Sequence, residues 1–510
     1  MELDKDLHAI QEMREAVKKA KAAQQQFQAF SQQDVDRIVK AMADSAFDKA
    51  YELASLAVME TGLGVIEHKV IKNQVASRDV YASIRDLKTV GIINEYRDQQ
   101  IVELAAPFGV IAGIVPTTNP TSTAIFKSLI ALKARNAIVF SPHPSAAKCT
   151  VEAAKICLQA AIAAGAPEGI IGWITQPTME ATEGLMKHKD INLILATGGS
   201  ALVRAAYSSG KPAYGVGPGN VPVYIERTAE IAKAVQRIVD SKTFDHGTIC
   251  ASEQAVIVDR NIREMVVREF KNLGAYFLNA EEKKKLEPII SPAPSKLNPK
   301  IVGRSAAVIA EMAGVQVPAE TRLLIAEEQH VGKDIPFSIE KLAPVFAFYT
   351  VDGWEDAAEI CEQLLDLGGR GHTLALHTTD DKIARSFALR MPVSRIVVNT
   401  PSALGAVGGT TGLKPSFTLG CGSFGGNITS DNLTAHHLMN VKRLAYGIKQ
   451  VDVPKQGRAA NSEYSRPAEE RATELQITDV VNQVMEKVGA TGRVDKATVV
   501  KLVHQVISQI

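Results

Sequence analysis

The N-terminal part of the chain, residues 1–85, carries its apolar side chains at helical spacing. Separations of three and four residues place such side chains on one face of a helix. The pattern is clearest in a single run: Val35, Ile38, Val39, Met42, Ala46 and Leu53. Gly62 interrupts the region, and glycine suits a helix C-terminus because it adopts the left-handed conformation without steric cost. We therefore predict helices, one of which ends at Gly62.

The middle of the chain alternates short apolar runs with helical patterns, several of them rich in alanine. A first series of apolar runs covers residues 109–115, 137–140, 170–174, 192–196 and 221–225. A second series covers residues 255–258, 343–349, 373–377 and 395–399. Apolar strands that alternate with helices are typical of parallel sheets covered on both faces. The pattern predicts two successive α/β domains, over residues 1–242 and 243–428.

Two further stretches predict features at the edges of these domains. Residues 91–103 are polar and β-prone, whereas residues 104–115 are almost continuously apolar. This order predicts an exposed β-ribbon, at about residues 91–108, that leads into a buried strand. Residues 419–427 are rich in glycine, and we expect this loop to fold over a site between the domains.

The chain changes character near residue 451. Residues 451–474 are polar, contain prolines and lack apolar periodicity, which is typical of a linker. Residues 475–510 then predict an amphipathic helical tail with two apolar stripes: Leu475, Ile477, Val480, Val481, Val484, Met485 and Val488, then Val499, Val500, Leu502, Val503, Val506 and Ile507. Such helices either pack on their own subunit or insert into a groove of another protein.

Composition excludes several classes of function. A chain of 510 residues is expected to form two or three domains, and its formal net charge of +1 lacks the basic excess of nucleic-acid-binding proteins. No apolar run approaches the roughly 20 residues that span a bilayer, and no apolar signal core follows the N-terminus. The five cysteines include no C-x-x-C pair, so we expect neither a metal site nor a disulfide framework. These features predict a cytoplasmic protein without nucleic-acid or membrane partners.

Candidate chemistry centres on Cys250. The segment Thr-Phe-Asp-His-Gly-Thr-Ile-Cys-Ala-Ser-Glu-Gln, residues 243–254, places one cysteine beside small residues just before an apolar run. Such a turn can present a thiol to a ligand while the following strand fixes its position. A thiol that attacks an aldehyde also needs a hydride acceptor and a donor for the developing oxyanion. The alternative is that Cys250 is one more buried apolar side chain.

The segment 243–254 resembles the active-site segment of the CoA-acylating aldehyde dehydrogenases, a branch of the aldehyde dehydrogenase superfamily. The resemblance covers about residues 20–450 and implies that superfamily's α/β fold, with Cys250 as the nucleophile. It also implies a homo-oligomer, a dimer or tetramer, built with the ribbon and residues 429–450. The implied reaction converts a short aldehyde, acetaldehyde or propionaldehyde, with NAD+ and CoA to acyl-CoA and NADH. From the length, we expect no fused alcohol dehydrogenase in this chain.

The nucleotide is expected at a turn that follows an apolar run. Residues 196–200, Ala-Thr-Gly-Gly-Ser, open a helical stretch, so backbone N–H groups would face an anion there, although a purely structural turn fits equally well. The superfamily holds NAD at the corresponding turn. Glu340 resembles the glutamate that binds the nicotinamide ribose and is otherwise a surface charge. The resemblance implies these cofactor-binding residues: Pro116, Thr117, Thr118, Ser141, Pro142, Thr197, Gly198, Gly199, Gly217, Glu340 and Leu342.

The adenosine end of that site departs from the superfamily pattern. Ser141 and Pro144 stand where hydrolytic aldehyde dehydrogenases carry a lysine and a glutamate for the adenosine ribose. The choice between NAD and NADP therefore stays open. His143, between them, is interpreted as a surface-loop residue rather than a ligand.

Asn119 is the candidate donor for the oxyanion. The segment Val-Pro-Thr-Thr-Asn-Pro-Thr, residues 115–121, resembles the superfamily loop whose asparagine amide supports the oxyanion. An amide suits this role because it is neutral and cannot quench a thiolate. The spacing between proline and asparagine is one residue longer than usual. Alternatively, Asn119 only forms a turn before Pro120.

The most informative feature is an absence. Hydrolytic relatives place a glutamate where it activates water against the thioester, but residues 213–222 contain no carboxylate, and Val216 stands near that position. Water is a poor nucleophile without a base, whereas the CoA thiol is a good one. Release to CoA is therefore expected. His246, four residues before Cys250, is a weaker candidate for proton transfer, and Cys421 is the cysteine to examine for proximity to the site.

Two other functions remain open. A hydrolytic NAD(P)-dependent aldehyde dehydrogenase would require a base that the sequence does not reveal. An inactive scaffold would use the C-terminal helices to recruit partners. For the tail, the resemblance favours encapsulation, because acylating aldehyde dehydrogenases of bacterial microcompartments often carry a terminal amphipathic helix on a linker. The tail would then contact shell proteins and place the protein in the microcompartment lumen.

Overall fold

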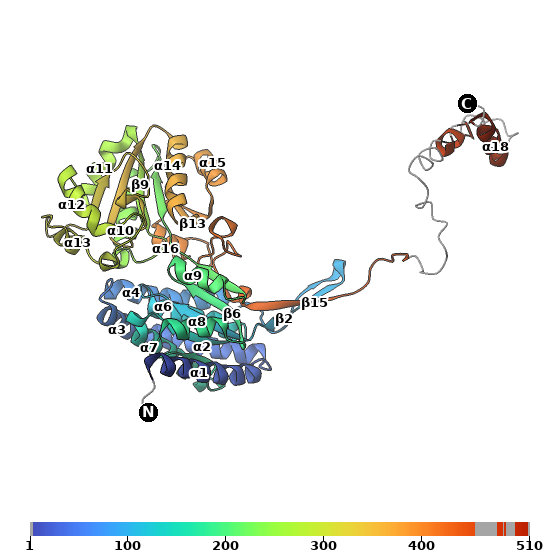
Figure 1. Cartoon of the computed structure of the whole chain (residues 1–510), viewed down its shortest axis with the longest axis horizontal. Helices are drawn as coiled ribbons and strands as arrows, with labels where there is room; N and C mark the ends of the chain where they lie inside the picture. Colours follow the sequence, from blue (N-terminus) through green and yellow to red (C-terminus); the bar gives the residue numbers. More distant parts are fainter. Residues whose placement is uncertain (1–3, 454–476, 483, 486–494, 508–510) are drawn as a thin grey trace. The chain divides into compact units, whose positions relative to one another are not determined.

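The computed structural model describes residues 4–453, 477–482, 484–485 and 495–507. The chain separates into two units, residues 1–446 and 447–510, which are described separately. Figure 1 shows the first unit as two groups of strands covered by helices. Among the helices of the described residues, none combines the length and apolar character that crossing a bilayer requires.

The N-terminal region is helical, as predicted. A reciprocal capping box between Ser31 and Asp34 begins the second helix, and Gly62 ends the third in the left-handed conformation with φ of 64°. The apolar stripe predicted from Val35 to Leu53 is buried. The helices are α1 (Lys5–Phe27), α2 (Gln32–Asp48), α3 (Ala50–Thr61), α4 (Ile66–Gln74) and α5 (Val80–Ile84).

The first sheet is parallel and has five strands in the order β5-β4-β3-β6-β7. Its strands are β3 (Val110–Val115), β4 (Ala137–Pro142), β5 (Ile171–Trp173), β6 (Ile191–Thr197) and β7 (Ala213–Val216). The connecting helices are α6 (Pro120–Lys133), α7 (Ala147–Ala163), α8 (Met179–Lys187) and α9 (Ser200–Tyr207). The order reverses between β3 and β6, and ligands of such sheets bind at the carboxyl ends of the strands beside this reversal.

The second sheet is parallel and has seven strands in the order β10-β11-β12-β9-β8-β13-β14. The strands are β8 (Val221–Ile225), β9 (Glu253–Asp259), β10 (Ala275–Phe277), β11 (Leu323–Glu327), β12 (Val345–Val351), β13 (Gly371–His377) and β14 (Val393–Val398). The helices are α10 (Ile231–Thr243), α11 (Arg263–Asn272), α12 (Ala280–Ile290), α13 (Ala306–Met312), α14 (Trp354–Leu367), α15 (Asp381–Arg390) and α16 (Ser402–Ala406).

Both faces of this second sheet are buried, as expected for continuously apolar strands. Val223 and Ile225 of β8 pack with α10 and α11 in one core, whereas Tyr224 packs with α12 and α14 in the other. Successive side chains of a strand point to opposite faces, so one short apolar run supplies both cores. The mixed α/β fold with two parallel sheets agrees with the sequence prediction.

Strand β8 requires a correction. The sequence pattern placed the run 221–225 with the first series of strands, but β8 pairs with β9 and β13 in the second sheet. The chain therefore crosses between the sheets after β7, upstream of residue 242. A buried apolar strand satisfies either sheet locally, so its pairing partner is decided by tertiary contacts. The pattern also missed four strands, β7, β10, β11 and β15 (Met439–Ala445).

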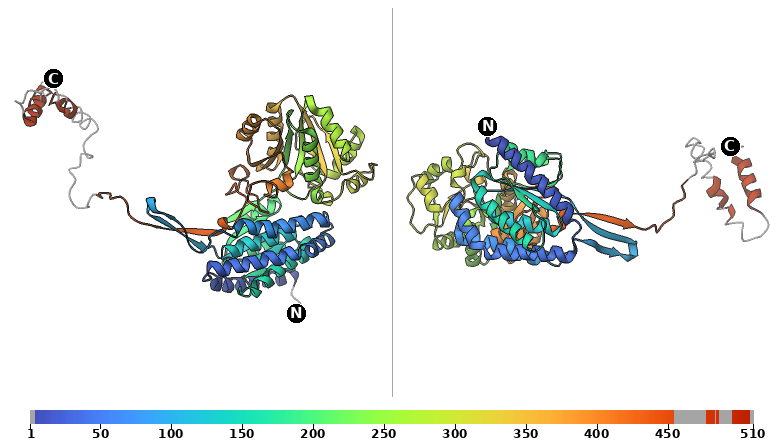
Figure 2. Two further views of the ribbon diagram at one scale, coloured as in Figure 1. Left: turned by 180° about the vertical axis from the view of Figure 1, so that it is seen from behind. Right: turned by 90° about the horizontal axis from the view of Figure 1, so that it is seen from below.

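The predicted ribbon is present. Strands β1 (Gly91–Tyr96) and β2 (Ile101–Pro107) form an antiparallel hairpin, and β15 pairs with the other edge of β2. Figure 2 shows β15 lying along this hairpin. Ile92, Tyr96 and Leu444 expose 51%, 43% and 47% of their surfaces. The ribbon therefore presents apolar side chains that the first unit itself does not cover.

The second unit is described only in part. Residues 477–482 and 484–485 are helical, as is α18 (Lys496–Ile507). Val481 and Val499 are buried, whereas Val480 and Leu502 are exposed. The predicted linker, apart from residues 451–453, and the remaining parts of the predicted tail lie outside the described residues.

We predict that Gly113→Ala in β3 destabilises the first sheet. A Cβ atom on Gly113 would lie 2.7 Å from the ring of Phe140, which is fully buried in β4. Overpacking of this kind costs about 1–3 kcal/mol of unfolding free energy. Denaturant titration measures the change. Gly332→Ala is the control, because its Cβ would meet nothing closer than 3.6 Å. Equal stability of the two variants would contradict this interpretation.

Candidate active site

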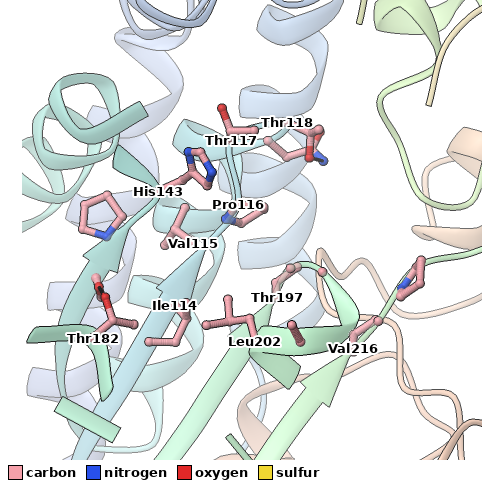
Figure 3. A pocket seen from close by; sticks show the side chains of 18 of the residues that line it. Ile114, Val115, Pro116, Thr117, Thr118, His143, Thr182, Thr197, Leu202 and Val216 are labelled. Atoms are coloured by element: carbon pink, nitrogen blue, oxygen red, sulfur yellow. Dashed lines mark hydrogen bonds between the residues drawn. The ribbon is translucent and has the colours of Figure 1, made fainter. Parts of the chain in front are cut away.

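One cavity of about 840 Å³ lies at the carboxyl ends of the first sheet. Its walls come from the loops after β3, β4, β6 and β7, from α8 and α9, and from the loops that precede β9 and β12. Figure 3 shows Ile114, Val115 and Pro116 on one side of the cavity and Thr197, Leu202 and Val216 on the other. The position matches the reversal of strand order between β3 and β6.

The structure brings every predicted site residue to this cavity. Cys250 and Asn119 line it together with all the predicted cofactor residues: Pro116, Thr117, Thr118, Ser141, Pro142, Thr197, Gly198, Gly199, Gly217, Glu340 and Leu342. His143, interpreted as a surface-loop residue, is exposed and also lines the cavity. His246 is not among the lining residues, and nothing in the described residues places it at the site.

The turn after β6 has the features of an anion site. Gly199 precedes α9 in an extended conformation, and no side chain caps the first turn of that helix. A Cβ atom on Gly199 or Gly217 would meet no atom within 4 Å, so the backbone of both borders open space. The free N–H groups and the helix dipole favour a phosphate. The residues present therefore fit the pyrophosphate of a dinucleotide.

Cys250 lies in the loop between the short 3-10 helix Phe244–Gly247 and strand β9, and its side chain is half-buried. Burial raises the pKa of its thiol to about 12, and the neighbouring acidic groups of Glu340 and Cys421 act in the same direction. The thiol is therefore protonated in the ligand-free protein near neutral pH. Its attack on a carbonyl requires that the proton leaves as the bond forms.

Glu340 is the carboxylate nearest to this chemistry. Burial raises its pKa to about 7, while a hydrogen bond from the Gly219 N–H to Oε1 (2.9 Å) and the charges of Lys242 and Lys341 act against this. Only Glu183 and Glu340 contribute carboxylates among the described residues that line the cavity. Val216 contributes an apolar side chain to the lining of the same cavity.

Asn119 does not act as a helix cap. It precedes α6, but its side chain makes no capping hydrogen bond. Instead its Oδ1 accepts a hydrogen bond from Lys72 Nζ (2.6 Å), and its Nδ2 donates to the Thr248 carbonyl (3.3 Å) and to Thr118 Oγ1 (3.1 Å). The amide therefore faces the Cys250 loop. These contacts do not support the alternative in which Asn119 only forms a turn.

A second group of residues lies behind the nucleophile, and the sequence pattern did not reveal it. Gly219 separates Cys250 from His372, since a Cβ on Gly219 would lie 2.3 Å from the Cys250 carbonyl oxygen and 3.1 Å from the His372 ring. Burial lowers the pKa of His372 to about 3, and its Nε2 has no partner among the described residues. Arg395 donates to the His372 carbonyl (3.0 Å) and to the Gly420 carbonyl.

Cys421 adjoins this group. It follows Gly420 directly and lies near enough to raise the pKa of Cys250, although it is not among the described residues that line the cavity. The expectation that Cys421 deserved examination for proximity is therefore supported. The only sequence signal for the group was polar residues within otherwise apolar strands, as with His372 at the start of β13. Among the described residues, no set of three or more His, Cys, Asp or Glu side chains is arranged to hold a metal ion.

Comparison with curated proteins gives close relatives. The chain is 49% identical to the bifunctional aldehyde-alcohol dehydrogenase of Escherichia coli (strain K12) over 441 residues. That match covers 86% of this chain and 49% of the relative, so the chain spans about half the length of the curated relatives it matches first.

Comparison with solved structures extends the similarity to the fold. An acetylating aldehyde dehydrogenase from Geobacillus thermoglucosidasius is 57% identical with a TM-score of 0.87, covering 88% of this chain and 100% of that one. A propionaldehyde dehydrogenase from the fucose utilisation microcompartment of Clostridium phytofermentans is 29% identical with a TM-score of 0.78, covering 85% and 97%.

The family assignment rests on the match to a whole-family profile. The profile described as "Aldehyde dehydrogenase family" matches residues 7–313, which is more than half of the chain and includes Cys250 and Asn119. Most residues that line the cavity fall within this range, whereas Glu340, Leu342, Phe417 and Leu419 lie beyond it. The chain belongs to the aldehyde dehydrogenase family.

Proposed function

We propose that the protein is a CoA-acylating aldehyde dehydrogenase that converts a short aliphatic aldehyde, NAD+ and CoA to acyl-CoA and NADH. The observation that carries the proposal is the wall of the cavity beside Cys250. Val216, which stands near the position of the water-activating base of hydrolytic relatives, lines the cavity with an apolar side chain that cannot activate water. The acetylating relatives support the same acyl acceptor.

The chain's own groups perform the acylation. The Cys250 sulfur forms a C–S bond to the aldehyde carbon while the thiol proton is released to solvent, and the carbonyl oxygen becomes an oxyanion that accepts a hydrogen bond from Asn119 Nδ2. The Thr197–Gly199 turn and Glu340 would hold a nicotinamide nucleotide, which would supply the hydride acceptor. Loss of hydride leaves a thioester on Cys250, and the CoA thiol then displaces the cysteine and restores its proton.

The hydrolytic alternative depends on Glu340. Its carboxyl group affects the pKa of Cys250, and its own pKa of about 7 would suit a general base. However, its Oε1 already accepts the Gly219 N–H, which holds the carboxylate in place for ribose hydroxyl groups. We therefore assign Glu340 to cofactor positioning and keep CoA as the acyl acceptor.

The proposed aldehydes are acetaldehyde and propionaldehyde. Phe417, Leu419 and Leu342 contribute apolar side chains to the cavity that contains Cys250. Such a lining suits a short alkyl chain and offers no charged partner for a carboxylated aldehyde. The names of the acetylating and propionaldehyde-specific relatives agree with this choice.

NAD is the proposed cofactor rather than NADP. No lysine or arginine occurs among the described residues that line the cavity, so a 2′-phosphate would lack a cationic partner there. At the end formed by β4 and α8, the Ser141 and Thr182 hydroxyl groups lie 2.8 Å apart, and Glu183 adds a carboxylate. A carboxylate accepts ribose hydroxyl hydrogens and repels a phosphate.

The ribbon and the tail support proposals about partners. The exposed apolar side chains of β1 and β15 suit an interface with a second copy of the chain, giving a dimer or tetramer. The exposed Val480 and Leu502 suit a shell protein of a bacterial microcompartment, which would place the enzyme in its lumen. The microcompartment relative lends support to this location.

The acyl acceptor can be identified with purified protein. We predict that sustained NADH formation from propionaldehyde requires CoA and yields propionyl-CoA in equal amount. Cys250→Ala should lower turnover to less than about one thousandth while the circular dichroism spectrum stays unchanged. No activity in the wild type would favour the inactive-scaffold alternative, whereas full activity in Cys250→Ala would show that Cys250 is not the nucleophile.

Glu340→Gln separates the two enzymatic alternatives. Because Glu340 holds the nicotinamide ribose in the proposed mechanism, the variant should lose about tenfold or more in kcat. The ratio of propionyl-CoA to propionate should not change. The hydrolytic reaction would be established instead if the wild type formed propionate in preference to propionyl-CoA and the Glu340→Gln variant no longer formed propionate.

Cofactor preference should follow from the charge at Glu183. We predict that kcat/KM is at least about tenfold higher with NAD+ than with NADP+, and that Glu183→Gln narrows the difference by improving NADP+. Steady-state kinetics with both cofactors measures this. Glu180→Gln, on the same helix but outside the cavity lining, is the control and should leave the ratio unchanged.

The tail proposal predicts that targeting and catalysis are separable. Leu502→Glu in the full chain, or a chain ending at residue 450, should keep full turnover and lose association with co-expressed shell proteins. The reason is that a charge on the exposed stripe of α18 opposes burial in an apolar groove. Co-purification with intact shells measures the association. Unchanged co-purification of both variants would contradict the proposal.

A further inference from the structure

Two buried lysines of α4 converge on the loop that carries the nucleophile. Lys69 and Lys72 expose 3% and 2% of their side chains, and both donate to Oδ2 of the fully buried Asp245. The Lys69 Nζ to Asp245 Oδ2 distance is 2.8 Å. Two ammonium groups and one carboxylate leave an excess positive charge in a place where burial is costly. Such an excess requires an explanation beyond packing.

Asp245 is held from several directions. Its Oδ1 accepts a hydrogen bond from the Val65 N–H (2.7 Å), and its Oδ2 also accepts one from the Thr248 hydroxyl group, Oγ1 (2.7 Å). Its backbone has a φ of 51°, a left-handed conformation that is uncommon for residues other than glycine. A Cβ atom on Gly64 would lie 1.9 Å from Asp245 Oδ1, so the glycine admits the carboxylate. Backbone strain of this kind concentrates at functional sites.

Lys72, unlike Lys69, also donates a hydrogen bond to the side chain of Asn119. Its Nζ donates to Asn119 Oδ1 (2.6 Å) and to Thr248 Oγ1 (3.0 Å), whereas Lys69 Nζ donates to the Thr118 carbonyl (3.1 Å). An ammonium group has only donors, so it can meet only the oxygen of the amide. The Asn119 Nδ2 must then point away from Lys72, toward the Thr248 carbonyl two residues before Cys250.

We propose that Lys72 is a positioning residue that orients and polarises the Asn119 amide, so that Nδ2 donates to the oxyanion formed on Cys250. Asp245 keeps the Lys72 ammonium in place, and Lys69 supports Asp245 without contacting Asn119. A hydrogen bond from a cation to the amide oxygen withdraws electron density and makes the amide N–H a stronger donor. The inference rests on the proposed function, because it concerns the same oxyanion.

Because the effect of Lys72 on Asn119 requires the charge of Lys72, this effect depends on pH. Burial lowers the pKa of Lys72 to about 8, against the attraction of Asp245. The other groups that face it are the Lys69 ammonium, Thr248, Asn119, Cys250 and the Phe244 ring, whose centroid lies 5.9 Å from Nζ. His68 stacks on that ring and accepts the Asp245 N–H (2.8 Å). Lys72 loses its proton, and its effect on Asn119, as the pH rises through about 8.

The test compares Lys72→Met with Lys69→Met in the full chain. Each variant removes one ammonium group from Asp245, but only Lys72→Met removes the partner of Asn119. We expect Lys72→Met to lower kcat for CoA-dependent NADH formation by about 10- to 100-fold. The loss of kcat in Lys69→Met should be several-fold smaller. In an Asn119→Ala background, Lys72→Met should lower kcat little further, because the two residues act as one unit.

Two readouts distinguish positioning from a structural role. The ratio of wild-type to Lys72→Met kcat should fall as the pH is raised from 7 to 9.5, because the wild type then loses the same charge. Thermal unfolding shows whether each variant is folded. If Lys72→Met does not fold, Lys72→Gln and Lys69→Gln replace the pair with the same expectation.

The outcomes separate this inference from the proposed function. Suppose that the wild type turns over with CoA. Any one of three results would then overturn the role of Lys72 alone: equal losses of kcat in the Lys69 and Lys72 variants, full additivity with Asn119→Ala, or a kcat ratio independent of pH. A wild type without CoA-dependent NADH formation would overturn the proposed function and this inference with it.

Discussion

The buried carboxylate of Asp245 connects parts of the active site that are distant in the sequence. It joins the start of α4, through Val65 and the two lysines, to the loop that carries Thr248 and Cys250. Removing one partner from a buried ion pair typically costs about 3–5 kcal/mol, because the remaining charge loses its compensation. The geometry of the nucleophile loop, and through Lys72 that of Asn119, therefore depends on this buried carboxylate.

Burial is also the common cause of the electrostatics around the nucleophile. It raises the pKa values of Cys250 and Glu340 and lowers those of His372 and Lys242, so each group is shifted toward its neutral form. Lys242 still donates to Gln254 Oε1 (2.9 Å). Burial disfavours the free thiolate and strengthens each remaining dipole that acts on an oxyanion.

The two sheets contribute different halves of the chemistry. The first provides the carboxyl ends of β3 and β6 and the uncapped turn before α9, which suit a dinucleotide. The second provides Cys250 ahead of β9, Glu340 ahead of β12 and His372 in β13. Gly219 lies at the junction, where its missing side chain lets Cys250 and His372 approach the same backbone. Substrate specificity can therefore vary with loops while the strands preserve the reacting positions.

The sequence by itself determined the local structure and the local chemistry. Helical spacing predicted the N-terminal helices, the apolar runs predicted most strands, and short motifs identified Cys250, Asn119 and the turn at Gly198, because periodicity and turn chemistry act within a few residues. Tertiary structure alone decided that β8 joins the second sheet and that Lys72, Asp245 and His372 gather around the nucleophile. The residues around a buried strand or a buried lysine in the sequence do not indicate its partner, because that partner is set only when distant segments pack together and exclude water.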